Sequence, residues 1–181
     1  MRIQKITDNN LKIALVVSLV AFAVFGRMMP HPPNFTPVAA AAIFGGAMLP
    51  RRWAVILPLI IMMISDYFIG FHSLTWLIWG CFAIIALASN YFVKRDKPYL
   101  IIGASIAGSM FFYLITNFGV WMQGVMYPMN IQGLINCYYM ALPFLRNTIL
   151  GDLAFTILLF AIYALVVQSS RVGVNKTAKP L

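Results

Sequence analysis

Charged residues are scarce in this sequence, and glutamate is missing altogether. Among 181 residues there are 13 Lys and Arg and four Asp, so charged residues make up 9% of the chain, against about 25% in an ordinary soluble domain. Hydrophobic residues make up 62%, and the mean hydropathy is +0.87. So few charges could not cover a soluble surface, and we expect lipid to be the solvent for most of the chain.

Cysteine is also rare, and several functional motifs are missing. Cys81 and Cys137 lie in apolar stretches, which does not fit a disulfide framework. No Cys or His cluster of the kind that holds zinc or an iron–sulfur centre surrounds them. The sequence has no Gly-rich phosphate loop and no legible Ser/His/Asp arrangement. We therefore expect no intrinsic cofactor and no ATP hydrolysis by the chain itself.

Apolar runs divide the sequence into transmembrane segments, each of which takes about 20 residues to cross a bilayer. Helices satisfy their own backbone polar groups in lipid, so the sequence predicts an all-α integral membrane protein with six transmembrane helices. The second segment is short, and we expect it to be tilted or shielded by its neighbours. Residues 1–168 are predicted to form one transmembrane domain, followed by a basic, mobile cytoplasmic tail, 169–181. The predicted spans are 12–29, 36–49, 53–71, 73–93, 98–122 and 147–168.

The connection 123–146 separates the last two predicted spans. It contains Tyr127-Pro128 and Leu142-Pro143 and is too polar in parts for a seventh span. It also carries apolar and aromatic residues, which would not float free in water. We expect a structured loop or a short interfacial helix that caps the bundle.

The positions of Lys and Arg predict the orientation. If the N-terminus is cytoplasmic, all of the 13 bases except Arg27 and Arg146 fall on the inner side. This bias follows the positive-inside rule and predicts both termini in the cytoplasm of a bacterial inner membrane. The net charge of +9 is thereby explained by topology, and we expect no nucleic-acid partner.

Several ionisable residues are predicted at or just below the outer surface. A charge inside a membrane costs about 2.5–3.5 kcal/mol on insertion scales and usually has a partner. Asp66 could pair with Arg27, and Asp152 with Arg146. Structural ion pairs and a ligand cavity are both open readings, and for Asp66 we favour the cavity. The outer residues of this kind are Arg27, His31, Asp66, His72, Arg146 and Asp152.

Small residues are concentrated in two of the predicted helices. The segment Ala39–Ala47 is mostly alanine and glycine, and the fifth span repeats a small-xxx-small pattern at Gly103, Ala104, Ala107 and Gly108. Such residues let helices approach closely. Packing within the chain is the favoured reading, and a docking face for a partner subunit is the alternative.

Four stretches together resemble the S components of energy-coupling-factor vitamin transporters, over about residues 11–168. Within that family, the chain is similar to the BtuM-like solitary transporters of vitamin B12. The resemblance implies an S-component-like bundle of six helices, a vitamin pocket open to the periplasm, and an optional energy-coupling-factor module docked on Ala39–Ala47. The stretches are residues 30–37 (PHPPNFTP), 64–66 (ISD), 116–121 (TNFGVW) and 146–152 (RNTILGD).

The same resemblance implies cobalamin as the first-choice ligand. Cys81, at the depth of the membrane, would bind the corrinoid cobalt and remove cyanide from cyanocobalamin, because a thiolate is a strong, soft ligand for such a metal. The alternative functions are an S component for another vitamin or micronutrient, a membrane-embedded enzyme, and a structural subunit of a larger membrane complex. The candidate ligand-binding residues are His31, Asp66, Tyr67, Asn117, Trp121 and Arg146.

Overall fold

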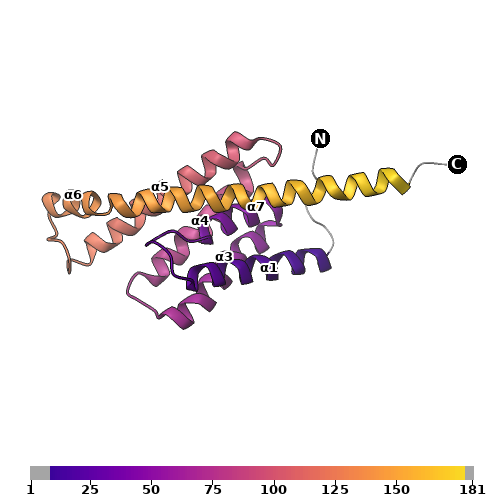
Figure 1. The fold of residues 1–181 in the computed structure, drawn as a ribbon. Coiled ribbons are helices and arrows are strands. Elements are labelled where there is room, and N and C mark those ends of the chain that lie inside the picture. Colours follow the sequence, from indigo (N-terminus) through magenta and orange to yellow (C-terminus); the bar gives the residue numbers. More distant parts are fainter. Residues whose placement is uncertain (1–8, 178–181) are drawn as a thin grey trace.

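The computed structural model describes residues 9–177, with side chains described for residues 13–166. This part of the chain is all-helical and has no β-strand. Figure 1 shows the helices as a bundle from which the C-terminal part of the last helix projects. The helices are α1 (Asn9–Met28), α2 (Val38–Met48), α3 (Arg51–Ile69), α4 (Thr75–Phe92), α5 (Pro98–Met122), α6 (Ile131–Met140) and α7 (Leu142–Thr177).

Each predicted span contains a helix, and the fifth has the predicted bounds, 98–122. The connection 123–146 holds the short helix α6, as expected. The last helix differs from the prediction at both ends, since α7 begins at Leu142 and continues to Thr177. Pro143 does not prevent the early start, because the first turn of a helix has no partner for the N–H that proline lacks. Residues 169–177 of the predicted tail are therefore part of α7, and residues 178–181 lie outside the described residues.

Four helices are long and apolar enough to cross a membrane. They are α3, α4, α5 and the part of α7 from Leu142 to Val166. The described apolar part of α1, Ile13–Met28, and the whole of α2 are shorter. The chain therefore has the make-up of a helical membrane protein, and helix length by itself accounts for four spans.

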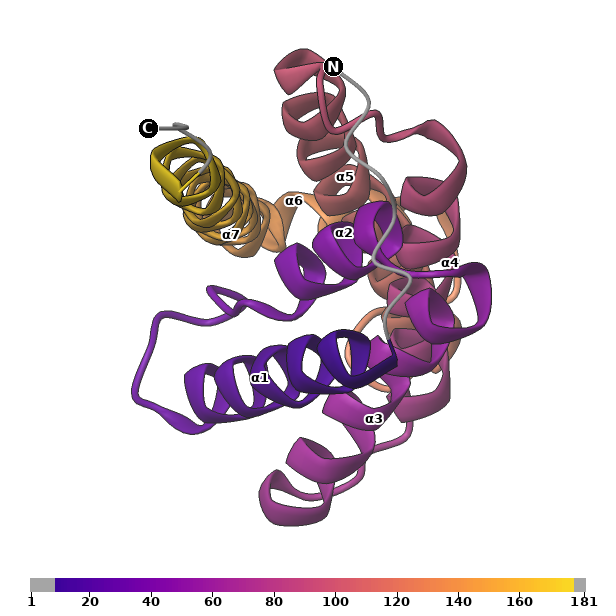
Figure 2. The ribbon, with the colours of Figure 1, turned by 90° about the vertical axis from the view of Figure 1, so that its right-hand side faces the viewer.

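Helix α2 is the core of the bundle. All of its 11 residues are buried, and it contacts α1, α3, α4, α5 and α7, which surround it in Figure 2. Eleven residues rise only about 16 Å, roughly half of a hydrocarbon layer. The small residues of Ala39–Ala47 thus serve packing within the chain. Because they are buried, a partner subunit would have to dock on some other surface.

Polar side chains from α4 and from the turn after it donate hydrogen bonds to the C-terminal end of α2. The amide of Asn90 donates hydrogen bonds to the carbonyl oxygens of Gly46 (2.7 Å) and Leu49 (2.9 Å). The guanidinium of Arg95 donates to the carbonyl oxygen of Ala47 (2.8 Å). These bonds satisfy carbonyls that a helix end leaves without partners, and the charge of Arg95 suits the negative end of the helix dipole.

The connections between helices gather at two opposite ends of the bundle. Segments 29–37, 70–74 and 123–141 contribute to shared hollows at one end, which we call the His31 end. Segments 49–50 and 93–97 meet at the other, where Arg95 bonds to the end of α2. We call this the Arg95 end.

Candidate functional site

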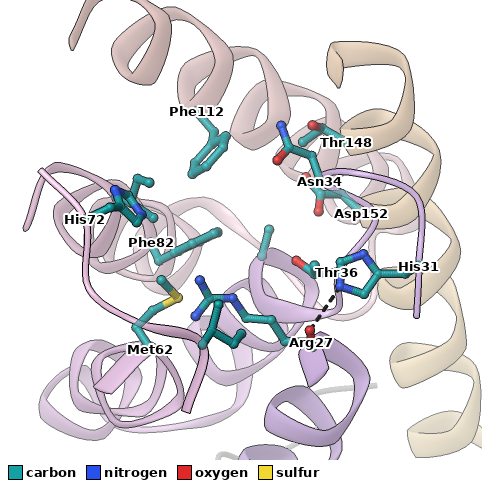
Figure 3. A pocket seen from close by; sticks show the side chains of 13 residues that line it. Arg27, His31, Asn34, Thr36, Met62, His72, Phe82, Phe112, Thr148 and Asp152 are labelled. Atoms are coloured by element: carbon teal, nitrogen blue, oxygen red, sulfur yellow. Dashed lines mark hydrogen bonds between the residues drawn. The ribbon is translucent and has the colours of Figure 1, made fainter. Parts of the chain in front are cut away.

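Two adjoining hollows open at the His31 end. The first has a volume of about 330 Å³ and the second about 380 Å³. Figure 3 shows the side chains that line the first hollow, which come from α1, α2, α3, α4, α5, α7 and the segments 29–37 and 70–74. The two hollows adjoin, since the same residues line both at their border. The shared residues are Asn34, His72, Ile78, Phe112 and Thr148.

The shortness of α2 creates the first hollow. Its N-terminus begins only at Val38, and Ala39 of its first turn lines the hollow. No side chain caps this N-terminus, so the positive end of the helix dipole lies beside the hollow. The segment 29–37 turns above it at Asn34, whose φ of 64° is a left-handed conformation that asparagine adopts more readily than most residues.

Arg27 and Asp66 form an ion pair beneath the first hollow. Nη1 of Arg27 lies 2.5 Å from Oδ1 of Asp66 and also donates a hydrogen bond to the hydroxyl of Ser65. Oδ2 of Asp66 accepts a hydrogen bond of 2.7 Å from the indole of Trp79. Asp66 is 1% exposed, whereas Arg27 reaches the hollow. Both oxygens of the carboxylate are therefore occupied, and its charge is compensated.

Asp152 of α7 lines the same hollow without such compensation. It is 3% exposed and accepts a 2.6 Å hydrogen bond from the hydroxyl of Ser109 on α5. Arg146, its expected partner, is exposed. Arg27 pairs with Asp66 instead. Of the two pairs that the sequence suggests, the structure forms one.

Two of the predicted ligand-binding residues line the hollows. His31 lines the first, and its ring nitrogens lie 2.9 Å from the carbonyl oxygen of Pro32 and 3.0 Å from that of Arg27. Asn117 lines the second, where its amide donates to the carbonyl of Tyr113 at 2.8 Å. Both side chains are thus held in place by hydrogen bonds to backbone carbonyls of the chain.

Four other predicted residues lie away from these hollows. Tyr67 is 76% exposed and packs edge-on against Phe68, and the indole of Trp121 donates to the carbonyl of Pro128 at 3.1 Å. Arg146 is exposed. Cys81 is 1% exposed within α4, where its neighbours Ile78 and Phe82 reach the first hollow instead.

Helix α6 forms a wall of the second hollow and is tied firmly to α5. The hydroxyl of Tyr113 donates to the carbonyl of Tyr138 (2.6 Å), and the hydroxyl of Tyr138 donates to the carbonyl of Leu114 (2.7 Å). Cys137 is buried here, and burial raises the pKa of its thiol. The thiol therefore stays protonated near neutral pH. Its hydrogen bond to the carbonyl of Asn117, at 3.3 Å, adds to the link between α6 and α5.

The sequence analysis misses several residues that line the hollows. Thr148 precedes Asp152 by four residues, and both face the first hollow because positions four apart share one side of a helix. This spacing could have identified Thr148. Phe112 carries no such signal, since one aromatic among many does not stand out. Missed lining residues are Asn34, Thr36, Phe112 and Thr148.

Metal-binding clusters of the usual kind are not found in the described part of the chain. No group of three or more His, Cys, Asp and Glu side chains gathers there. A site for zinc or a similar metal would need such a group.

Comparison with known proteins gives one match. A family model described as a family of unknown function (DUF6580) matches residues 7–175. No curated protein and no solved structure matches the chain.

Proposed function

The chain belongs to the DUF6580 family, and we propose that it is a membrane transporter that captures a vitamin-sized solute outside the cell and takes it inward. The observation that carries this proposal is the pair of adjoining hollows at the His31 end. Ligand pockets typically occupy about 300–1,000 Å³ and combine an apolar lining with a few fixed polar groups. The hollows match this description in volume and in lining.

Charge supports an orientation in which the hollows face outward. Arg51, Arg52, Lys94, Arg95 and Lys97 belong to the Arg95 end, whereas Arg27 and Arg146 belong to the His31 end. The positive-inside rule then puts the Arg95 end in the cytoplasm and the hollows on the periplasmic side of a bacterial inner membrane. In this arrangement α1 and the shielded α2 complete six crossings, and both termini are cytoplasmic.

Binding can be tested with the protein purified in a mild detergent. Water-soluble vitamins would be added one at a time, and a ligand would raise the midpoint of thermal unfolding, because it stabilises the folded state that binds it. Thr148→Phe should abolish the rise, because a phenyl ring at the border that both hollows share would obstruct the site. Leu150→Phe is the matched control, since Leu150 is 50% exposed and should leave the rise intact.

The proposal fails if no vitamin stabilises the unmodified protein, or if Thr148→Phe folds normally and keeps the full response. Thermal unfolding without ligand shows whether each variant is folded. Uptake of the binding vitamin by cells that carry each variant then tests transport.

Cobalamin is the first vitamin to test, because it is the ligand that the family resemblance suggests. A corrinoid is larger than either hollow alone and would have to occupy both. Cys81 is buried and lines neither hollow, so its thiol would reach the cobalt only after a rearrangement at α4.

The visible spectrum of the bound corrinoid tests this ligand directly. If Cys81 binds cobalt, protein loaded with cyanocobalamin should have a spectrum different from that of the free vitamin. Cys81→Ser should restore the free spectrum or lose the ligand, and Cys137→Ser should change neither. If Cys81→Ser leaves the spectrum of the bound corrinoid unaltered, Cys81 is not a cobalt ligand. The proposal that the protein captures a vitamin is then still tested by the thermal unfolding experiment.

A further inference from the structure

We propose that four side chains between α5 and α7 form a binding site for a monovalent cation, with Na⁺ as the ion. The four are Ser105 and Ser109 of α5 and Asp152 and Thr156 of α7, which we call the α5–α7 oxygen cluster. This inference concerns an ion rather than the transported solute and does not rest on the proposed function.

The first observation is the uncompensated carboxylate of Asp152. It is 3% exposed, and its hydrogen-bond partner is the neutral hydroxyl of Ser109. Arg27 lines the same hollow, but its guanidinium forms an ion pair with Asp66. A buried carboxylate is neutralised by a proton, by a basic side chain or by a bound cation. Within the described residues no basic side chain is paired with Asp152.

The second observation is independent of the first. Ser105 and Thr156 are 0% and 1% exposed, and the hydroxyl oxygens of both lack a hydrogen-bond partner. Serine and threonine hydroxyls on membrane helices normally donate to a carbonyl one turn earlier, as Thr116 does to Phe112 at 2.7 Å. A buried polar group without a hydrogen-bond partner destabilises the fold by about 1–3 kcal/mol. We therefore expect a bound partner at these two hydroxyls.

Helix register brings the two observations together. Helices α5 and α7 pack against each other and run in opposite directions, since the end of α5 and the start of α7 both lie beside α6 (Figure 1). Ser109 contacts Asp152 directly. One turn further from α6, α5 carries Ser105 and α7 carries Thr156. The hydroxyls of these two residues therefore lie at the same level along the helices, about 5 Å from the carboxylate in the direction away from α6.

The ligand set and its access suit Na⁺. One carboxylate and three hydroxyls supply hard oxygen ligands with a single negative charge, whereas Ca²⁺ sites usually use several carboxylates and transition metals prefer nitrogen or sulfur. The first hollow provides a route, because Asp152 lines it. An ion from the solution at the His31 end could reach the carboxylate without crossing the helix packing.

The test measures thermal unfolding of the purified, solute-free protein in Na⁺, with choline replacing Na⁺ to keep ionic strength constant. We expect the unfolding midpoint to rise with Na⁺ and to saturate. Asp152→Asn should abolish the rise. Ser105→Ala and Thr156→Val should each weaken the apparent Na⁺ affinity about tenfold, the effect of losing one ligand interaction of ordinary strength.

Ser89→Ala is the matched control, because Ser89 is a buried serine of α4 outside the cluster. It should keep the unmodified Na⁺ response. Binding of radioactive ²²Na⁺ provides a second measurement that remains valid if a variant is less stable but still folded. An unfolding midpoint indifferent to Na⁺, or a response that Asp152→Asn leaves unchanged, would overturn the proposal. Either result would show that Asp152 is neutralised by a proton and that water satisfies the hydroxyls.

Discussion

At the scale of single residues, the two buried carboxylates differ in their partners because of helix geometry. Asp66 meets Arg27 across two helices. Arg146 and Asp152 are six residues apart on one helix, α7, so at 3.6 residues per turn their side chains point about 120° apart. Residues three or four apart would share a face, but residues six apart do not. Arg146 therefore lies exposed while Asp152 is buried.

The ion pair of Arg27 and Asp66 leads to a prediction about stability. Arg27→Met should leave the Asp66 carboxylate buried without its charge partner and destabilise the fold by about 3–5 kcal/mol. Arg146→Met should change stability by less than about 0.5 kcal/mol, because it removes an exposed side chain. Reversible unfolding of each variant in detergent, followed by circular dichroism, measures the difference. Equal stabilities of the two variants would contradict the importance of the pair.

At the scale of helices, α2 shows why small residues are needed at the centre of the bundle. Five helices surround it, and at Gly46 the backbone of α4 comes so close that no side chain fits. A Cβ atom built at Gly46 would lie 2.8 Å from the Cβ of Ser89 and still closer to the carbonyl oxygen of Ala86. The sequence predicts close packing of this segment, and the structure shows that α4 is the neighbour that requires it.

Gly46→Ala should therefore destabilise the protein, by about 1–3 kcal/mol, because the added methyl group overpacks the contact between α2 and α4. Gly80→Ala is the control on α4. No atom lies within 4 Å of a Cβ built at Gly80, and alanine favours a helix over glycine by about 1 kcal/mol. Unfolding midpoints should thus fall for Gly46→Ala and stay level or rise for Gly80→Ala. A neutral Gly46→Ala would show that the two helices separate easily.

At the scale of the whole molecule, the arrangement of the connections bears on topology. Successive connections alternate between the His31 end and the Arg95 end, with α6 as an extra cap at the first. Bases are concentrated at the Arg95 end. The sequence bias and the spatial grouping of the bases thus lead to the same proposed orientation.

Reporter fusions test this orientation. A reporter fused after Leu181 should be active in the cytoplasm, and one inserted in the 123–130 turn should be active in the periplasm, because the positive-inside rule holds the basic connections inside. Alkaline phosphatase and a fluorescent protein report the two compartments. Reporters active in the same compartment would contradict the six-span topology.

The sequence by itself indicates that lipid surrounds most of the chain, that the structure is helical, and approximately where most of the helices begin and end. These follow from local quantities: apolar runs indicate lipid, backbone polar groups in lipid require helices, and prolines with polar residues mark the connections. It also predicts His31, in a proline-bounded outer connection, and Asn117, in a stretch that carries the family resemblance, as ligand-binding residues, and both line the hollows.

Only the tertiary structure decides which of these residues share a hollow. Thr148 and Phe112 meet His72 there, whereas Tyr67, Trp121 and Arg146 point elsewhere. It likewise decides that Arg27 pairs with Asp66. The physical reason is that a side chain's direction depends on the rotation and depth of its helix relative to its neighbours, and close packing around the short, buried α2 sets both.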